Sequence, residues 1–287
     1  MNTQEELNLI QTQPVAIHLP DQGLLKISGP DAKKFLQGQV TCNLDEVTAE
    51  HSQHGAHCTP QGRVVFLFRL FFSKESYYFF LPKSMIPLAL NALKKYAVFF
   101  KVQLEDVSLT VPFYGRLQHP ETSLAYAISD TRYLIMDSTP EPTLPVVSQN
   151  VWHYLDIIAG LPSVYPETTE KFLPHDLNMH LIHGINFNKG CYTGQEIIAR
   201  MQHRGTLKNH MYRAKITSRT RPAPGADVFC EGKTGPEASG IIVAVCEEGY
   251  NNYQVLLVAG EKQVQASPFF LEPNSLLTFL DLPYQYA

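Results

Sequence analysis

The chain has 287 residues, of which 44% are hydrophobic and 17% are charged, and its formal net charge is −4. This composition is that of a globular protein with room for two or three modules, and it excludes a disordered chain. A negative net charge gives no global basic field, so direct binding of nucleic acid is not expected.

No segment predicts export or a membrane span. The first residues, Met1–Glu6, are polar and lack the positive and apolar regions of a signal peptide. The longest apolar run, Val64–Phe72, contains Arg69 and is shorter than the ~20 residues that a membrane helix needs. We therefore expect a soluble protein of the cytoplasm, with no membrane partner.

The cysteines predict neither a disulfide framework nor a structural zinc site, because they are odd in number and form no C-x-x-C pair. They are Cys42, Cys58, Cys191, Cys230 and Cys246. A group of candidate metal ligands, His51, His54, His57 and Cys58, lies close together in the sequence. On a strand His54 and His57 would point to opposite faces, and the segment is equally compatible with a polar loop. We expect no metal site there.

The first 137 residues alternate between strand and helix patterns. Turn-bounded apolar runs predict strands at Val15–Leu19, Leu24–Ser28, Arg63–Phe72, Ser76–Leu81, Val102–Val107, Leu124–Ile128 and Tyr133–Asp137. Helices are predicted after Gly29-Pro30-Asp31, ending at Gly38, and at Ser84–Tyr96, with Pro87 in the first turn. Short turns between such elements favour an α+β fold with antiparallel sheets.

The pattern changes in the second half of the chain. The proline-rich residues 138–148 predict a linker or long loop, and Val151–Ala159 predicts a helix. Short strands are then expected at Tyr212–Ile216, Gly240–Val245 and Tyr253–Val258, a spacing typical of a small β-barrel or sandwich. The predicted organisation is an α+β unit of two subdomains at residues 1–206 and a β-barrel module at residues 207–287.

One stretch concentrates residues suited to chemistry: Phe187–Arg200 reads F-N-K-G-C-Y-T-G-Q-E-I-I-A-R. Thr193 and Glu196 have the T-x-x-E spacing of a capping box, so a helix is expected to begin there. Cys191 would then lie just before the helix, near the positive end of its dipole and close to Lys189. Both features would favour the thiolate form of Cys191.

The same stretch also has a structural interpretation. A cysteine near a helix start is often a small buried side chain, and Glu196 would then do no more than cap the helix. Gly190 and Gly194 favour a built site, because glycine lets backbone N–H groups approach a ligand closely.

The run Lys189–Glu196, K-G-C-Y-T-G-Q-E, resembles the hallmark of the YgfZ-type folate-binding proteins over eight consecutive positions. Ile27–Gln39, I-S-G-P-D-A-K-K-F-L-Q-G-Q, resembles the opening of the same family. These proteins are relatives of the glycine cleavage T protein, an aminomethyltransferase. The resemblance implies a ring of antiparallel-sheet α/β subdomains with a small C-terminal β-barrel. It also implies bound tetrahydrofolate or a derivative, iron–sulphur proteins as partners, and a role in iron–sulphur cluster assembly or repair that affects tRNA modification indirectly.

The resemblance assigns roles to individual residues. Cys191 would be the functional thiol; Asp176, Lys189, Tyr192 and Arg200 would contact the folate; Thr193, Glu196, Gly190 and Gly194 would support the loop. Asp176 follows Pro174-His175, where T proteins have a Pro-x-Glu segment that offers a carboxylate to the pterin. A carboxylate suits this role because its two oxygens accept from adjacent N–H donors in one plane. Asp176 could equally cap a helix over Leu177–Ile182.

Arg200 and Arg204 follow Glu196 at i+4 and i+8, on one helix face. They could hold the carboxylates of a folate glutamate tail, or they could form a solvated stripe of salt bridges. The solvated stripe is expected for Arg204, and both interpretations stay open for Arg200.

One departure separates this chain from the catalytic aminomethyltransferases. They carry an aspartate just after a Gly-rich turn in their first half, whereas the corresponding stretch here, Pro60–Leu67, has no acid and contains Phe66. A phenyl ring cannot take part in proton transfer. We therefore expect a folate-binding protein that supports iron–sulphur enzymes, with a folate-dependent aminomethyl or one-carbon transferase as the alternative.

Overall fold

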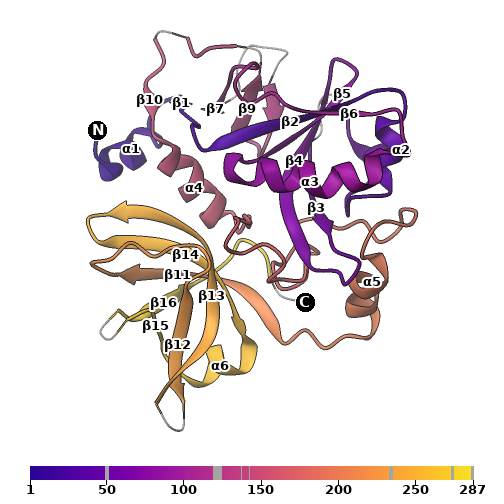
Figure 1. Ribbon diagram of the computed structural model, residues 1–287. Helices are drawn as coiled ribbons and strands as arrows, with labels where there is room; N and C mark the ends of the chain where they lie inside the picture. The colour runs from indigo at the N-terminus through magenta and orange to yellow at the C-terminus, as the bar shows by residue number, and fades with distance from the viewer. Residues whose placement is uncertain are drawn as a thin grey trace.

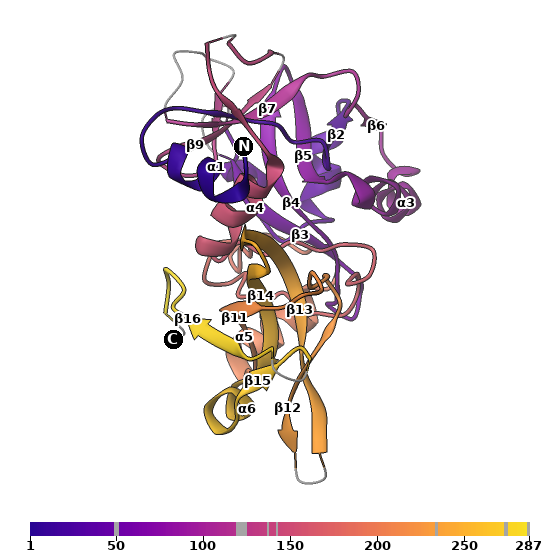
Figure 2. The same cartoon turned by 90° about the vertical axis from the view of Figure 1, so that its left-hand side faces the viewer.

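The computed structural model describes residues 1–48, 52–118, 125–136, 138–141, 143–232, 235–272 and 275–285. In this part of the chain the helices are α1 (Thr3–Leu9), α2 (Ala32–Gln37), α3 (Ile86–Ala97), α4 (Gln149–Ile158), α5 (Gln195–Arg204) and α6 (Glu261–Ala266), with short 3-10 helices η1 (Leu44–Glu46) and η2 (Lys83–Met85). The described strands form three sheets. Two of them lie together with α1 to α4, and the third forms a separate body toward the C-terminus (Figures 1 and 2).

The first sheet is antiparallel and contains the most apolar strands of the chain. Its order is β3-β4-β5-β2-β6, formed by β2 (Gln22–Ser28), β3 (Gln53–Cys58), β4 (Val64–Ser73), β5 (Ser76–Pro82) and β6 (Gln103–Asp106). The predicted β4–β5 pair and the helix that follows it are confirmed. Pro87 lies in the first turn of α3, where its missing N–H costs nothing.

Strands β4 and β5 are buried on both faces, and they separate two hydrophobic cores. Successive residues of a strand point to opposite faces. Phe66, Phe68 and Phe79 pack in the core that α3 covers. Phe71 and Phe80 pack in the other core, against Trp152 of α4 and the second sheet. The first sheet is therefore an inner layer, which explains why β4 and β5 read as nearly continuous apolar runs.

The second sheet has the order β10-β1-β7-β9-β8, with β1 and β10 parallel and the other pairs antiparallel. Its strands are β1 (Ala16–Ile17), β7 (Phe113–Leu117), β8 (Ala125–Ala127), β9 (Arg132–Met136) and β10 (Val146–Val147). Strand β7 and helix α1 were not predicted, and the expected proline-rich linker contributes β10. Buried Glu6 of α1 accepts hydrogen bonds from the Ser148 backbone N–H, at 2.9 Å, and from the Ser148 hydroxyl. These bonds connect the residue after β10 to α1.

The C-terminal sheet is a strongly curled, six-stranded half-barrel in the described residues. Its order is β15-β12-β13-β14-β11-β16, formed by β11 (Asn209–Thr217), β12 (Asp227–Gly232), β13 (Gly235–Gly249), β14 (Asn252–Gly260), β15 (Phe269–Phe270) and β16 (Leu277–Leu280). An isolated bridge between Phe270 and Leu276 brings the two edges together. The three predicted strands are confirmed and extended, whereas the short strands β12, β15 and β16 were not predicted.

The C-terminal sheet packs against the rest of the molecule. Met211, Val243 and Leu256 belong to the same buried cluster as the first sheet and α3. Asn150 of α4 adds two hydrogen bonds of 2.7 and 2.8 Å to the backbone of Glu247. The boundary at residues 206 and 207 stays a prediction, because the hydrophobic core continues across it.

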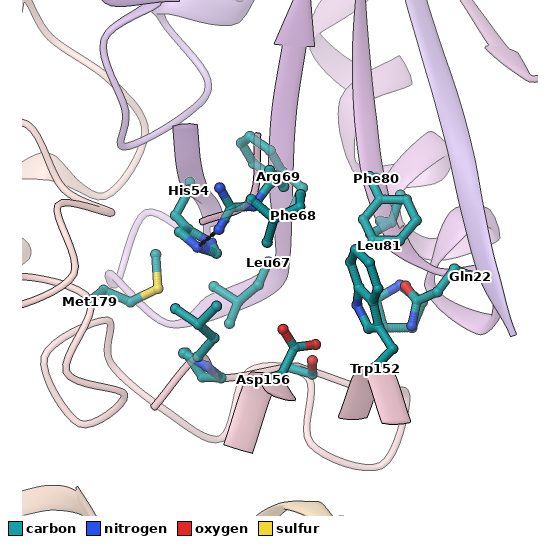
Figure 3. A pocket seen from close by; sticks show the side chains of 16 residues that line it. Gln22, His54, Leu67, Phe68, Arg69, Phe80, Leu81, Trp152, Asp156 and Met179 are labelled. Carbon is teal, nitrogen blue, oxygen red and sulfur yellow. Dashed lines mark hydrogen bonds between the residues drawn. The ribbon is translucent and has the colours of Figure 1, made fainter. Parts of the chain in front are cut away.

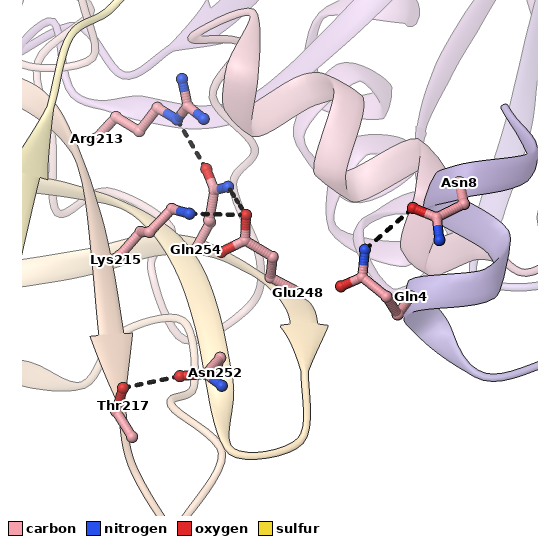
Figure 4. Close-up of polar contacts among 8 residues, drawn as sticks. All are labelled: Gln4, Asn8, Arg213, Lys215, Thr217, Glu248, Asn252 and Gln254. Atoms are coloured by element: carbon pink, nitrogen blue, oxygen red, sulfur yellow. Dashed lines mark hydrogen bonds and ion pairs between the residues drawn. The ribbon is translucent and has the colours of Figure 1, made fainter. Parts of the chain in front are cut away.

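A polar network on β11, β13 and β14 faces α1 across a cleft of about 720 Å³ (Figure 4). Glu248 accepts from Lys215 at 2.9 Å and from Gln254 at 2.8 Å, and Gln254 in turn accepts from Arg213 at 2.8 Å. Gln254 is buried, so these bonds satisfy an amide that would otherwise destabilise the sheet.

None of the helices in the described ranges has the length and apolar character that crossing a membrane would require.

Buried histidines make the stability of the fold dependent on pH. Burial lowers the pKa of His54, His57, His153, His175 and His180, in the last case to about 4. Because an unfolded histidine has a pKa of about 6.5, the unfolded chain binds more protons than the folded chain between these values. This contribution to stability is complete above pH ~6.5 and is lost as the pH falls toward 4.

We expect the free energy of unfolding, measured with urea, to be lower at pH 5 than at pH 7. Each additional proton bound by the unfolded state contributes about 1.4 kcal/mol per pH unit. His180→Phe should make the decrease smaller, whereas His18→Gln, a change at an exposed histidine, should leave it unchanged. Equal stability at the two pH values would contradict the prediction.

Candidate functional site

The motif loop, residues 187–194, leads into α5, and it forms differently from the predicted capping box. The helix begins at Gln195, its N-cap is Gly194, and no side chain caps it, so the predicted capping box of Thr193 and Glu196 is wrong. The Thr193 hydroxyl donates instead to Gln39 at 3.4 Å, and the Glu196 carboxylate pairs with Arg200. These partners connect Thr193 to the segment after α2 and leave Glu196 on the helix surface.

The turn at Gly194 explains why the helix starts later than predicted. Gly194 has a φ of +84°, and a Cβ there would lie 2.6 Å from the carbonyl oxygen of Thr59. Gly62, in the β3–β4 turn, has a φ of +75° and lies directly against this residue. The two glycine turns are therefore packed backbone to backbone, a contact that only residues without a side chain allow.

Lys189 fastens the motif loop to the segment after α2. Its ammonium group is buried and donates to the carbonyl oxygens of Val40, at 2.7 Å, and Cys42, at 2.6 Å. Burial lowers the pKa of Lys189 to about 8, partly offset by Cys42 and nearby acids. The ammonium also lies 5.2 Å from the ring centre of Tyr192, which is itself buried. Among the hydrogen bonds of the described residues, neither of the two made by this ammonium is to Cys191.

Cys191 lies between these two buried side chains and is exposed, unlike the other four cysteines. The alternative that it is a small buried hydrophobe is therefore wrong. Burial raises the pKa of Cys42, Cys58 and Cys246. The thiolate is the reactive form of cysteine, so burial makes these three thiols poor nucleophiles at neutral pH.

Asp176 lies away from the motif loop, at the edge of a cavity of about 860 Å³ beside the C-terminal sheet. Arg63, Lys171 and Lys208 also line this cavity. The carboxylate accepts from the Leu173 backbone N–H at 2.9 Å. Burial raises the pKa of Asp176, while the Leu173 N–H and Arg63 oppose that change.

The helix predicted as an alternative role for Asp176 is not formed. The residues after Asp176 form a series of turns, and its carboxylate bonds to a backbone N–H that precedes it. The Asp176 carboxylate also interacts with the side chain of Asn209, and its role toward a ligand stays a prediction.

The structure does not bring all the predicted site residues to one cavity. The described residues that line the Asp176 cavity do not include Cys191, Lys189, Tyr192 or Arg200. Arg200 is exposed and forms the i,i+4 pair with Glu196 at 2.6 Å, the solvated arrangement that was one of its two interpretations. Such exposed pairs contribute little to stability.

A second cavity lies where the first sheet, the second sheet and α4 meet (Figure 3). This central cavity consists of two adjoining hollows of about 60 and 450 Å³ that share His54, Arg69, Ile128 and Leu161. Its other walls include Phe68, Phe80, Trp152, Asp156 and Arg132. The sequence analysis missed these residues as a group. The signal was Arg69, a charge within an otherwise apolar strand.

The histidines around β3 are separated by the strand, as the alternation of side chains requires. His54 contacts Arg69 in the central cavity, whereas the His57 ring packs 5.3 Å from Phe66 in the core under α3. His51 lies outside the described residues. Within the described ranges, histidine, cysteine and acidic side chains do not gather in a group that could hold a metal ion.

We expect Gly194→Ala to destabilise the fold by about 1–3 kcal/mol, because alanine is strained at this φ and its methyl group would meet Thr59. Gly190→Ala is the matched control in the same loop, since a Cβ at Gly190 meets nothing within 4 Å. Chemical denaturation of both variants measures the difference. Equal stabilities would mean that the two glycine turns are not closely packed.

No protein-family model matches the chain, but a solved structure and several protein sequences are similar to it. Among solved structures, glycine cleavage system aminomethyltransferase T from Bartonella henselae is similar with a TM-score of 0.69 over 98% of this chain and 88% of its own. The sequence identity is 11%, so this similarity shows the fold: a mixed α+β fold of the aminomethyltransferase T type.

Proteins of similar sequence identify the family of the chain within this fold. The tRNA-modifying protein YgfZ of Photobacterium profundum is 32% identical over 300 residues, covering 93% of this chain and 91% of the relative. YgfZ of Colwellia psychrerythraea is 34% identical over 227 residues, covering 68% and 70% of the two chains. The chain belongs to the YgfZ family, which confirms the family predicted from the K-G-C-Y-T-G-Q-E run.

Proposed function

We propose that this protein binds tetrahydrofolate and uses the Cys191 thiol to support the assembly or repair of iron–sulphur enzymes. The observation that carries the proposal is the exposure of Cys191 on a loop that buried neighbours hold in place. Lys189 and Tyr192 anchor the chain on either side, so the thiol is presented to a partner without being free to move far. Its relatives are named tRNA-modifying proteins. An effect on tRNA would then pass through modifying enzymes that carry such clusters.

The cavity beside Asp176 suits a folate by its size and chemistry. Its volume of about 860 Å³ lies within the ~300–1,000 Å³ of small-molecule sites. The Asp176 carboxylate would accept from the adjacent N–H donors of the pterin. Arg63, Lys171 and Lys208 could pair with the carboxylates of the glutamate tail, while Phe172 and Ile241 offer apolar wall. When bound, tetrahydrofolate would supply a carrier for one-carbon groups.

The alternative function, aminomethyl transfer, requires an acidic side chain that is expected in the catalytic relatives. The corresponding stretch of this chain, Pro60–Leu67, has no acid. Phe66 is fully buried, and its ring packs against His57, Phe68 and Phe79. A position inside an aromatic core cannot deliver or accept a proton during transfer. This argument favours a role in which folate is bound without conventional aminomethyltransferase chemistry.

We expect Asp176→Ala to weaken tetrahydrofolate binding about tenfold or more, because pterin donors would lose a charged acceptor in a partly buried site. Arg204→Ala, a change at an exposed residue, should have little effect. Isothermal titration calorimetry on the two variants and the wild type measures the contrast. Equal small losses would remove Asp176 from the site, and no binding by the wild type would remove folate from the function.

In cells that lack this protein, we expect iron–sulphur enzyme activities to fall and to recover with the wild-type gene but not with Cys191→Ser. Serine keeps the size and polarity of the side chain and removes the thiolate. Asn188→Ser, at an exposed position of the same loop, should restore activity. The purified protein should release no one-carbon unit from an aminomethyl donor. Full recovery with Cys191→Ser, or folate-dependent transfer, would favour the transferase.

A further inference from the structure

The C-terminal end of α3 exposes two adjacent apolar side chains, Val98 and Phe99, called here the apolar pair. Val98 is 75% exposed and Phe99 is 83% exposed. Other strongly exposed apolar side chains in the described ranges, such as Leu109 and Tyr250, stand alone in the sequence. Helix α3 lies at the outer edge of the molecule, away from the C-terminal sheet (Figure 2). Single exposed apolar side chains are ordinary on a protein surface, whereas a contiguous group of them is typical of an interaction site.

The turn that carries the apolar pair is held firmly to α2. The Lys101 backbone N–H donates to the Asp31 carboxylate at 2.8 Å, and the Lys101 carbonyl oxygen accepts from the Asp31 N–H at 3.4 Å. The Phe100 ring packs against Phe35 of α2, with 5.4 Å between the ring centres. Because Phe100 and Lys101 are fixed in this way, the exposure of Phe99 is imposed by the fold.

Lysines surround the apolar pair. Lys94 and Lys95 precede Val98 by four and three positions, so their side chains lie on the same face of the helix end. Lys101 follows Phe99 by two positions. All three lysines are exposed, and the ion pairs between described residues include none of them. Their ammonium groups are therefore available to a partner.

The charge around the apolar pair is one-sided, although the chain as a whole has a net charge of −4. Residues 76–104 include four lysines and no acidic residue. Two nearby acids already have partners. Glu105 lies opposite Lys26 in the register of β6 and β2, where opposite charges attract, and Asp31 accepts from the Lys101 backbone. The lysines thus give the apolar pair a positive rim.

We propose that the apolar pair and its three lysines form a docking site for an acidic protein that offers an apolar pocket bordered by carboxylates. Protein interfaces concentrate their binding energy in a few buried anchors, often aromatic, which are surrounded by a polar rim. Phe99 and Val98 have the place of such anchors, and the lysines have the place of the rim. Carboxylates of the partner would pair with the lysines and speed association.

The site fits a protein better than the other anionic surfaces of a cell. A nucleic acid binds through many phosphate contacts along a basic face, whereas this rim has three lysines on a chain of negative net charge. A lipid surface holds a protein stably when two insertion signals act together, and the apolar pair is a single short one. The site shares no residue with the motif loop or the described lining of the Asp176 cavity, so it does not rest on the proposed function.

Photocrosslinking of the full chain in cells captures the partner. p-Benzoylphenylalanine replaces Phe99, or Tyr250 as the matched control, because Tyr250 is an exposed aromatic residue (89%) between β13 and β14. We expect position 99 to give a protein adduct that position 250 does not give. The proposal is overturned if position 99 gives no specific adduct, or if it captures lipid, nucleic acid or a second copy of this chain.

The captured protein is then identified by mass spectrometry, purified, and titrated with the wild-type chain by isothermal titration calorimetry. Phe99→Ser should weaken binding about tenfold or more, because it removes the aromatic anchor. Tyr250→Ser is the control and should bind like the wild type. Equal affinities of Phe99→Ser and the wild type would exclude Phe99 as an anchor and overturn the proposal.

The same titration tests the acidic character of the partner. The triple variant Lys94→Gln, Lys95→Gln, Lys101→Gln should bind about tenfold more weakly, and added salt should weaken the wild-type complex. Lys83→Gln, a change at the opposite end of α3, is the control for loss of one charge. Binding that neither salt nor the triple variant weakens would contradict an acidic partner. Because the salt titration uses the wild type, it decides the question even where a variant fails to fold.

Discussion

The burial of β4 on both faces is the constraint on which the rest of this structure depends. A strand that is covered on both sides must send alternate residues into two different environments. On one side Phe66 and Phe68 complete the core under α3, and on the other Arg69 and Phe71 face the second sheet and α4. The same strand thus contributes to the aromatic core under α3 and to the central cavity. Its side chain in that cavity, Arg69, contacts the neutral groups of His54 and Ser52.

In the motif loop, too, neighbouring side chains lie in different environments. Lys189 and Tyr192 point inward and hold the loop to the segment after α2, while Cys191 between them is exposed. Two glycine turns, at Gly62 and Gly194, fix the loop against the β3–β4 hairpin. The eight-residue run Lys189–Glu196 therefore combines residues that hold the loop in place with one accessible thiol. Lys189 and Tyr192 can be required for the structure of the loop without contacting a ligand.

Membership of the YgfZ family and the aminomethyltransferase T fold set the context for these features. Fold alone does not assign chemistry, because one architecture carries many different sites. Here the differences lie in particular residues: Phe66 fills a core position, and of the two buried arginines Arg69 and Arg132 in the central cavity, Arg132 pairs with the Asp156 carboxylate. These features are more informative about function than the arrangement of sheets and helices.

The sequence by itself determined the family, the strands β4 and β5 and the helix α3. Each rests on a local signal, namely a specific run of residues, a nearly continuous apolar segment, or a proline in a first helical turn. The short strands of the second and C-terminal sheets escaped prediction because two to six residues carry too little periodicity.

Tertiary structure alone decided where α5 begins, what Lys189 binds and which residues surround Arg69. The T-x-x-E spacing predicted a cap, but the contact of Gly194 with Thr59 delays the helix. Lys189 and Val40 are 149 positions apart, and Arg69 and Asp156 line one cavity only because two sheets and α4 converge. Local patterns record the period of a helix or strand, whereas contacts between distant segments depend on how those elements pack.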